Sequence, residues 1–100
     1  MATEGNNLSE YDFNSVPDGS AMTLGIVVSE WNSKITLGLL SGAKAKLLKH
    51  GVAEENIQIH FVPGAFELPL AAQYMLKSTA VDAVICLGCV IQGETKHFDF

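Results

Sequence analysis

The chain has 100 residues, of which 48% are hydrophobic and 17% are charged, and its formal net charge is −5. This composition is typical of one small globular domain and not of a disordered segment. All six basic residues are lysines, so neither a nucleic-acid surface nor an arginine fork for phosphate is expected. The longest apolar run, residues 83–91, is far shorter than the roughly 20 residues of a membrane span.

The cysteines and histidines also limit the class of protein. The first residues lack the basic and apolar stretches of a secretory signal, and there are two cysteines, which predicts a reducing, cytoplasmic location. Cys86 and Cys89 form a C-x-x-C pair on a predicted strand, where they point to opposite faces. We interpret them as small buried residues and not as a redox pair. The three histidines have no metal-ligand spacing, so no metal site is expected, and His50 and His60 are interpreted as structural or surface residues.

In chain order, residues 1–20 are polar and predict an N-terminal arm. Residues 23–29 (TLGIVVS) are apolar and β-branched, and this pattern predicts a strand buried on both faces. Asn32 or Ser33 is expected to cap a helix that runs to about His50, with Gly51 as the left-handed residue after it. An apolar stripe at a spacing of four is expected to face the core: Ile35, Leu39, Ala43 and Leu47.

The second half of the chain repeats the strand–helix pattern. Residues 56–62 alternate and predict a strand with Ile57, Ile59 and Phe61 on one face. Pro63 and Gly64 end it, and a helix is predicted over 65–78, where proline is tolerated only near the first turn. Its expected apolar stripe is Leu68, Ala72, Met75 and Leu76. Residues 81–87 (VDAVICL) predict a third strand.

The order strand–helix–strand–helix–strand predicts an α/β fold with a parallel sheet and right-handed crossovers. The loops that follow the three strands, at 29–32, 63–67 and 88–97, then lie at one edge of the sheet. Ligands of open α/β sheets bind outside the carboxyl ends of the strands. We therefore expect the functional residues in these loops.

The first loop holds Trp31, the only tryptophan of the chain, followed by Asn32. An aromatic ring at this position can stack on a planar heterocycle while Asn32 hydrogen-bonds the edge of that ring. Alternatively, Trp31 only packs against the start of the helix. Its position alone leaves both interpretations open.

The second loop, PGAFE, holds a glycine that permits close backbone approach or a positive φ. The N–H groups of Ala65, Phe66 and Glu67 open a helix and have no acceptor within it. A simple interpretation is a buried Phe66 beside a solvated Glu67. The functional interpretation is that these N–H groups and the carboxylate hold a polyhydroxyl chain.

The third loop, GETKH, combines a glycine, a hydroxyl, free N–H groups and a histidine at residues 93–97. A glycine-containing turn can form an anion-binding concavity, and imidazole titrates near neutrality and can relay a proton. By itself the pattern is weak, because histidines in loops are usually only solvated.

Three stretches, WNSKITLGLLSGAKAKLLKHGV, VPGAFELPLAAQ and LGCVIQGETKHFDF, resemble in order and spacing the signature blocks of the 6,7-dimethyl-8-ribityllumazine synthase family. The resemblance covers residues 22–100. It implies a three-layer, flavodoxin-like α/β/α fold and a domain over 21–100. It also implies condensation of 5-amino-6-(D-ribitylamino)uracil with 3,4-dihydroxy-2-butanone 4-phosphate, without a cofactor.

The resemblance also implies roles for single residues. Trp31 and Asn32 match the positions that contact the pyrimidine ring, and Ala65, Phe66 and Glu67 match the segment that holds the ribityl chain. The remaining matches are Cys89, Val90 and Ile91 for the pyrimidine, Glu94 and Thr95 for phosphate, and His97 for proton transfer.

Two departures from the family accompany these matches. Gln92 stands where many members carry arginine. Family chains also extend well beyond the position of Phe100, and that part supplies a fourth strand and a phosphate-binding arginine. The chain is therefore expected to correspond to the N-terminal two-thirds of the family domain.

Members of the family form homopentamers, in many cases assembled into hollow shells of sixty subunits with active sites between neighbours. The arm is expected to lie against a neighbouring sheet. The alternative from another class is a non-catalytic assembly subunit, or one that binds a flavin-like ligand, on the same scaffold.

Overall fold

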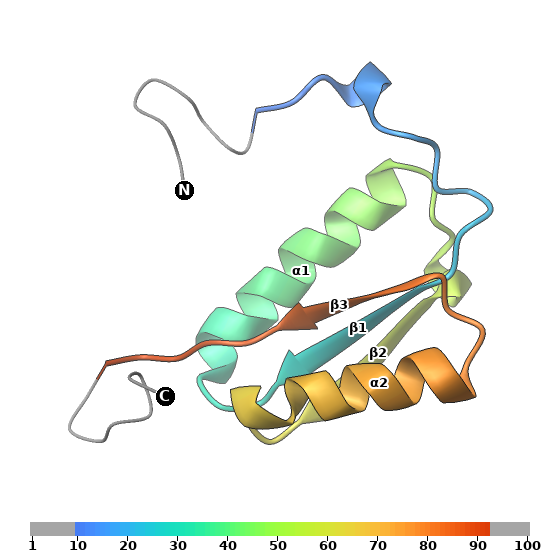
Figure 1. Cartoon of the computed structure of the whole chain (residues 1–100). Coiled ribbons are helices and arrows are strands. Elements are labelled where there is room, and N and C mark those ends of the chain that lie inside the picture. The colour runs from blue at the N-terminus through green and yellow to red at the C-terminus, as the bar shows by residue number, and fades with distance from the viewer. Residues whose placement is uncertain (1–9, 93–100) are drawn as a thin grey trace.

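The sheet is built around β1 (Leu24–Ser29), which lies between β2 (Ile57–Val62) and β3 (Ala83–Leu87) in the order β2-β1-β3 (Figure 1). The computed structural model describes residues 10–92. Both neighbours run parallel to β1, as predicted, and every residue of β1 is buried. The apolar residues of β1 therefore pack on both faces of the sheet, as continuous apolar runs usually do in parallel sheets.

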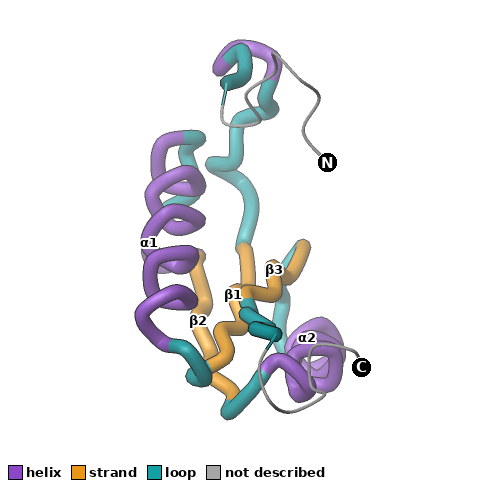
Figure 2. Tube along the Cα trace, turned by 90° about the vertical axis from the view of Figure 1, so that its left-hand side faces the viewer, coloured by secondary structure: helices purple, strands orange, loops and turns teal. Residues whose placement is uncertain are grey.

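Two helices cover opposite faces of this sheet (Figure 2). The helix α1 (Ser33–Lys49) packs on the face that carries Leu24, Ile26 and Val28. The helix α2 (Leu68–Ser78) packs on the other face, against Val27. The predicted three-layer α/β arrangement is confirmed for the described residues.

The face of α1 that meets the sheet differs from the predicted one. Ala43 and Leu47 pack against the core as expected, but Ile35 and Leu39 are 46% and 43% exposed. The inner positions nearer the start of the helix belong instead to the fully buried Thr36 and the half-buried Leu40. Apolar residues occur on several sides of α1, so a spacing of four fits more than one face and does not select between them.

The second helical segment begins with a short 3-10 turn, η3 (Ala65–Glu67), and becomes α-helical at Leu68, with Pro69 in the first turn. Leu68 and Met75 are buried, as predicted. Leu76 was predicted to face the core but is exposed, because the buried pair at a spacing of seven already defines the inner face.

The third strand begins at Ala83 and not at Val81. The residue before it, Asp82, uses its side chain to accept a hydrogen bond of 2.8 Å from the Thr23 N–H. Cys86 was predicted to be buried but is exposed, since β3 is an edge strand of the described sheet and no described element lies beyond it.

The N-terminal segment crosses the amino ends of the strands and contacts the end of α1. Its 3-10 turn η1 (Phe13–Ser15) brings the Phe13 ring onto the His50 ring, with centroids 4.5 Å apart. The Tyr11 hydroxyl lies 2.8 Å from His50 Nε2, and Lys46 Nζ donates to the same hydroxyl at 3.2 Å. His50 is therefore a structural residue, as predicted.

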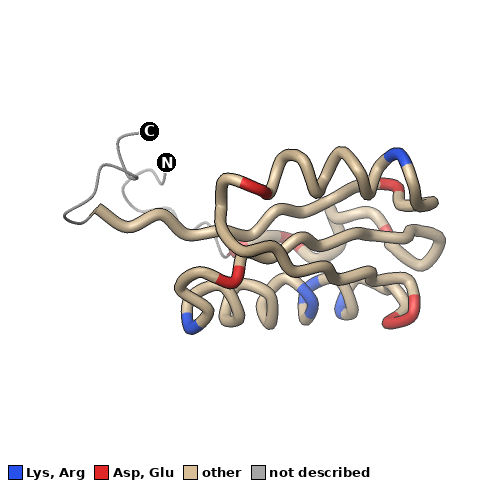
Figure 3. The backbone as a smooth tube through the Cα atoms, turned by 90° about the horizontal axis from the view of Figure 1, so that it is seen from below, with Lys and Arg blue, Asp and Glu red and all other residues tan. Residues whose placement is uncertain are grey.

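Charge is divided between helices and loops in the described part of the chain (Figure 3). The described lysines all lie on α1 and α2, and every described Asp and Glu lies outside these two helices. Lys46 and Lys49 occupy the last turn of α1 and Lys77 that of α2, where cations favour the negative end of the helix. Among residues 10–92 there is no helix with the length and apolarity to cross a membrane.

Candidate functional site

The loops after β1 and β2 are joined by backbone hydrogen bonds at the carboxyl edge of the sheet. The Glu30 N–H donates to the Val62 carbonyl at 2.7 Å, and the Trp31 N–H donates to the Pro63 carbonyl at 3.0 Å. These bonds keep the two segments in contact past the end of β1. Trp31 and the PGAFE turn are thereby held side by side.

Asn32 links the first loop to the third. Its side-chain amide nitrogen lies 4.0 Å from Cys89 Sγ. Its backbone carbonyl accepts hydrogen bonds from the N–H groups of Ile35 at 2.9 Å and Thr36 at 3.1 Å. Asn32 or Ser33 was predicted to cap α1, and Asn32 occupies the N-cap position, but its side chain makes no capping hydrogen bond. The reason is its left-handed backbone (φ 58°, ψ 51°), a conformation that asparagine tolerates better than most residues.

The indole of Trp31 is 52% exposed. Packing against the start of α1 therefore accounts for only part of this side chain, and half of the indole surface is free to meet another molecule. The exposed part of Trp31 is accessible to a ligand, and stacking on a ligand stays a prediction.

In the PGAFE turn, the burial of Phe66 and Glu67 is the opposite of that in the simple interpretation. Phe66, expected in that interpretation to be buried, is 94% exposed, and Glu67 is half-buried. The carboxylate of Glu67 accepts the Gly64 N–H at 2.9 Å, which closes the turn. Gly64 has a φ of −147°, so no positive φ is required there.

Gly88 sets how closely the third loop approaches the second. A Cβ atom at this position would stand 2.7 Å from Leu68 Cδ1 and 3.3 Å from Ala65 Cβ, so only glycine fits without a shift. Beyond it, Cys89 is half-buried, and Val90 and Ile91 are exposed. The three loops thus meet over the carboxyl end of β1.

Two buried hydroxyls near this edge were missed by the sequence analysis. Ser29 Oγ, at the last residue of β1, and Thr36 Oγ1, in the first turn of α1, are fully buried and have no hydrogen-bond partner among the described residues. The only signal in the sequence was a small polar residue at the end of an apolar strand. That signal is too common to identify a site.

Several predicted site residues lie outside the described residues: Glu94, Thr95 and His97. The structure therefore brings together Trp31, Asn32 and the Ala65–Glu67 turn with Cys89, and it leaves the expected phosphate loop untested. In the described part of the chain, no three His, Cys, Asp or Glu side chains are grouped in a way that could hold a metal ion.

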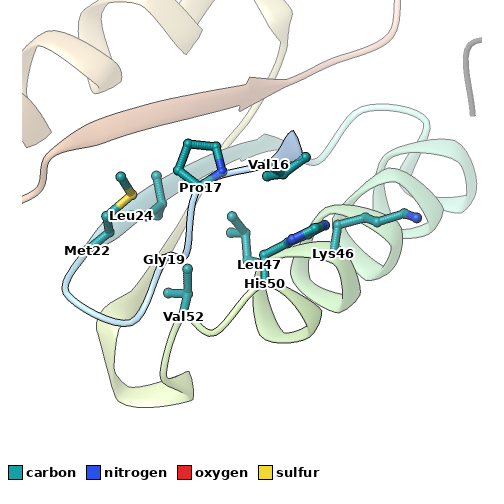
Figure 4. A pocket seen from close by; sticks show the side chains of 9 residues that line it. All are labelled: Val16, Pro17, Gly19, Met22, Leu24, Lys46, Leu47, His50 and Val52. Carbon is teal, nitrogen blue, oxygen red and sulfur yellow. The ribbon is translucent and has the colours of Figure 1, made fainter. Parts of the chain in front are cut away.

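A cavity of about 260 Å³ lies at the opposite end of the sheet (Figure 4). It lies between the N-terminal segment and α1, and its wall is mostly apolar: Val16, Pro17, Gly19, Met22, Leu24, Leu47 and Val52, with Lys46 and His50. None of the predicted site residues that the structure describes lines it. We regard it as a packing gap under the N-terminal segment, because the polar groups beside it already bond to one another.

Comparison with known proteins assigns the family. Residues 21–100 match the family model for 6,7-dimethyl-8-ribityllumazine synthase. Proteins with that name from Parabacteroides distasonis and Phocaeicola vulgatus are 58% and 56% identical to this chain over its whole length, and one from Flavobacterium johnsoniae is 56% identical. The chain spans 62%, 60% and 53% of the length of these relatives. It belongs to the 6,7-dimethyl-8-ribityllumazine synthase family.

Proposed function

We propose that this chain supplies the pyrimidine- and ribityl-binding part of a lumazine synthase active site. The reaction condenses 5-amino-6-(D-ribitylamino)uracil with 3,4-dihydroxy-2-butanone 4-phosphate to give 6,7-dimethyl-8-ribityllumazine and inorganic phosphate. The observation that carries the proposal is the meeting of the three loops at the carboxyl edge, through the Trp31–Pro63 and Asn32–Cys89 contacts.

Trp31 and Asn32 are proposed to bind the pyrimidine ring. The exposed indole offers a face for stacking on a flat heterocycle, which is worth about 1–3 kcal/mol where bases stack on aromatic side chains. Asn32 stands next to it, and its side-chain carbonyl remains available to a ring N–H while its amide faces Cys89.

Ala65, Phe66 and Glu67 are proposed to hold the ribityl chain. One carboxylate oxygen of Glu67 accepts the Gly64 N–H, and the other remains free to accept a hydroxyl. The N–H groups of Ala65 and Phe66 can donate to further hydroxyls, whereas the Glu67 N–H already donates to the Gly64 carbonyl at 3.2 Å. Phe66 is the most exposed of the large apolar side chains that the structure describes, and this supports a surface that another molecule or subunit covers.

Cys89, Val90 and Ile91 are proposed to read the edge of the pyrimidine through their backbone. No backbone–backbone hydrogen bond outside the helices and strands involves these three residues among those described. Their N–H and C=O groups are therefore available to a planar ligand with alternating donors and acceptors.

The chemical steps are assigned to the following loop. Glu94 and Thr95 are proposed to bind the phosphate, and His97 is proposed to transfer protons. An amine of the pyrimidine attacks the ketone and forms an imine with loss of water, phosphate is eliminated, and a second attack with loss of water closes the ring. Each step moves protons near neutral pH, which suits imidazole. No cofactor is required.

We further propose that the protein works as a cytoplasmic homo-oligomer, as a pentamer or a shell of sixty subunits, and that its partners are small molecules. Exposed apolar side chains on the outer side of α2, at Leu70, Tyr74 and Leu76, support a surface that other subunits cover. The chain has no arginine, so a phosphate-binding arginine would come from a part of the protein outside it.

A turnover assay tests the proposal. The chain extended to the length of its relatives is mixed with both substrates, and release of phosphate is measured together with lumazine absorbance. Equal amounts of both products are expected. Tight binding of the pyrimidine without any product would identify a non-catalytic binding subunit instead.

A further inference from the structure

Ser29 is the feature of the site that its proposed chemistry does not use. It is the last residue of the central strand, its side chain is fully buried, and Oγ has no partner among the described residues. A buried hydroxyl without a partner destabilises the folded state, and native structures contain few such groups. Its presence at the carboxyl edge therefore calls for a partner that residues 10–92 do not supply in the described structure.

The neighbours of Ser29 define where such a partner must come from. Ser29 pairs in register with Val62, and it lies on the α2 face of β1 because it is two residues after Val27. Ala65 and Val62 pack on that same face. On the other side, Val28 pairs with Leu87, so the next residue of the chain, Gly88, lies beside Ser29.

The backbone after Gly88 also lacks hydrogen-bond partners among the described residues. Among the described residues, no backbone–backbone hydrogen bond outside the regular elements involves residues 89–92, and Val90 and Ile91 are exposed. Unpaired backbone groups and an unpaired hydroxyl thus lie next to each other at the end of the same strand. A buried hydroxyl such as that of Ser29 is strongly favoured to pair when a backbone group comes within reach and water is excluded.

We propose that Ser29 is a positioning residue of the site. Its hydroxyl takes up a hydrogen bond to the backbone of residues 88–92 when a ligand occupies the carboxyl edge and draws this segment over the strand ends. The identity of the ligand, a ribityl-substituted pyrimidine, rests on the proposed function. The role of Ser29 rests on its burial, its missing partner and its place in the sheet.

Thr36 provides a matched control. Its hydroxyl is equally buried and equally without a partner among residues 10–92, but it belongs to α1, which packs on the other face of β1. Ser29→Ala and Thr36→Val each remove one buried hydroxyl that has no partner among residues 10–92. Only Ser29→Ala removes a group that the inference assigns to the ligand-bound state.

The experiment uses the chain extended to the length of its relatives. The melting temperature is measured without ligand, and binding of 5-amino-6-(D-ribitylamino)uracil is measured by calorimetry in the absence of the second substrate. Both variants are expected to melt about 2–8 °C higher than the parent, because each loses an unpaired buried group. Ser29→Ala is expected to bind the pyrimidine about 2- to 12-fold more weakly, and Thr36→Val is expected to bind it as the parent does.

The outcomes separate the two proposals. If Ser29→Ala melts lower than the parent, the hydroxyl has a partner in the free protein and the inference is wrong. It is also wrong if Ser29→Ala binds the pyrimidine as tightly as the parent, or if Thr36→Val loses the same affinity. If the parent itself does not bind the pyrimidine, the proposed function fails and the inference fails with it.

Discussion

The two ends of the sheet differ in how many of their side chains have hydrogen-bond or packing partners within the described structure. At the amino end, the Tyr11 hydroxyl contacts both His50 and Lys46, Phe13 stacks on His50, and Asp82 accepts the Thr23 N–H. Nearly all of these contacts join segments that are distant in sequence. The groups at this end stabilise the fold and leave little chemistry for a ligand.

The carboxyl end has the opposite character. Phe66 and Trp31 expose large aromatic surfaces, Ser29 has a buried hydroxyl without a described partner, and the backbone after Gly88 is unpaired in the described segment. The cavity lies at the satisfied end and the unsatisfied groups lie at the other. In this molecule, polar groups without described partners and exposed aromatic side chains indicate the proposed site better than the cavity does.

The sharpest test of this contrast compares His97, which the proposed function assigns to the site at the carboxyl end, with His50 at the amino end. His97→Ala is expected to lower kcat by about 10²–10⁴-fold while pyrimidine binding persists, because general acid–base help has that size. His50→Gln, at the amino end, is expected to leave kcat unchanged at temperatures where the variant is folded. Steady-state turnover and calorimetric binding on both variants provide the comparison. A His97→Ala variant with the kcat of the parent would remove this residue from the mechanism.

Trp31 tests whether exposure at the carboxyl end reflects binding. Trp31→Ala is expected to weaken the pyrimidine by about 5- to 150-fold, as follows from the energy of an aromatic–base stack. Trp31→Phe is expected to lose much less, since a flat face remains. Tryptophan emission in the parent reports the same contact, and it should change saturably as the pyrimidine is added. A Trp31→Ala variant with a lower melting temperature but unchanged affinity would mean that the indole only packs the start of α1.

Sequence patterns predicted the architecture because burial on both faces requires a continuous apolar strand. Residues 24–29 read as such a strand and form β1, and the loops with unusual chemistry fell where a parallel sheet collects them. The family resemblance was confirmed by the match over residues 21–100. These inferences depend on local composition and on topology, which the sequence expresses directly.

The burial of some side chains was predicted wrongly because sequence periodicity alone does not determine which face of a helix packs on the sheet. Ile35 and Leu39 share the spacing of Thr36 and Leu40, and only the packing of α1 on β1 decides which pair turns inward. The left-handed backbone of Asn32 and the missing partner of Ser29 are properties of three-dimensional assembly. Neither property has a sequence pattern that distinguishes it from more common arrangements of the same residues.

Tyr11→Phe tests the satisfied end with a smaller effect. The change deletes the hydroxyl that contacts His50 and accepts from Lys46 but keeps the ring, so we expect a loss of about 0.5–1 kcal/mol in the free energy of unfolding. Pyrimidine affinity should not change. Denaturant unfolding and calorimetry measure the two quantities, and an affinity loss in Tyr11→Phe would show that the two ends are coupled.

The smallest expected effect belongs to an exposed ion pair at the amino end. Lys44 Nζ lies 2.9 Å from Glu54 Oε1, and the hydrogen bond and then the charge of Lys44 hold the pKa of Glu54 below its ordinary value. Because the folded-state pKa is the lower one, the pair stabilises the fold above the ordinary glutamate pKa of about 4.3, and this contribution disappears as the pH falls through the lowered value. Both side chains are in contact with solvent, so the gain is small and screened by salt.

Glu54→Gln should therefore melt slightly below the parent at pH 7 and low salt, and the gap should close both in acid and at high salt. Glu55→Gln is the control, since Glu55 belongs to the same 3-10 turn, η2 (Glu54–Asn56), is also exposed, and has no ion pair in the described structure. It should melt like the parent at every pH. A gap for Glu54→Gln that grows toward low pH would contradict the sign derived from the lowered pKa. It would mean that the carboxylate is less favourable in the folded state than in the unfolded one.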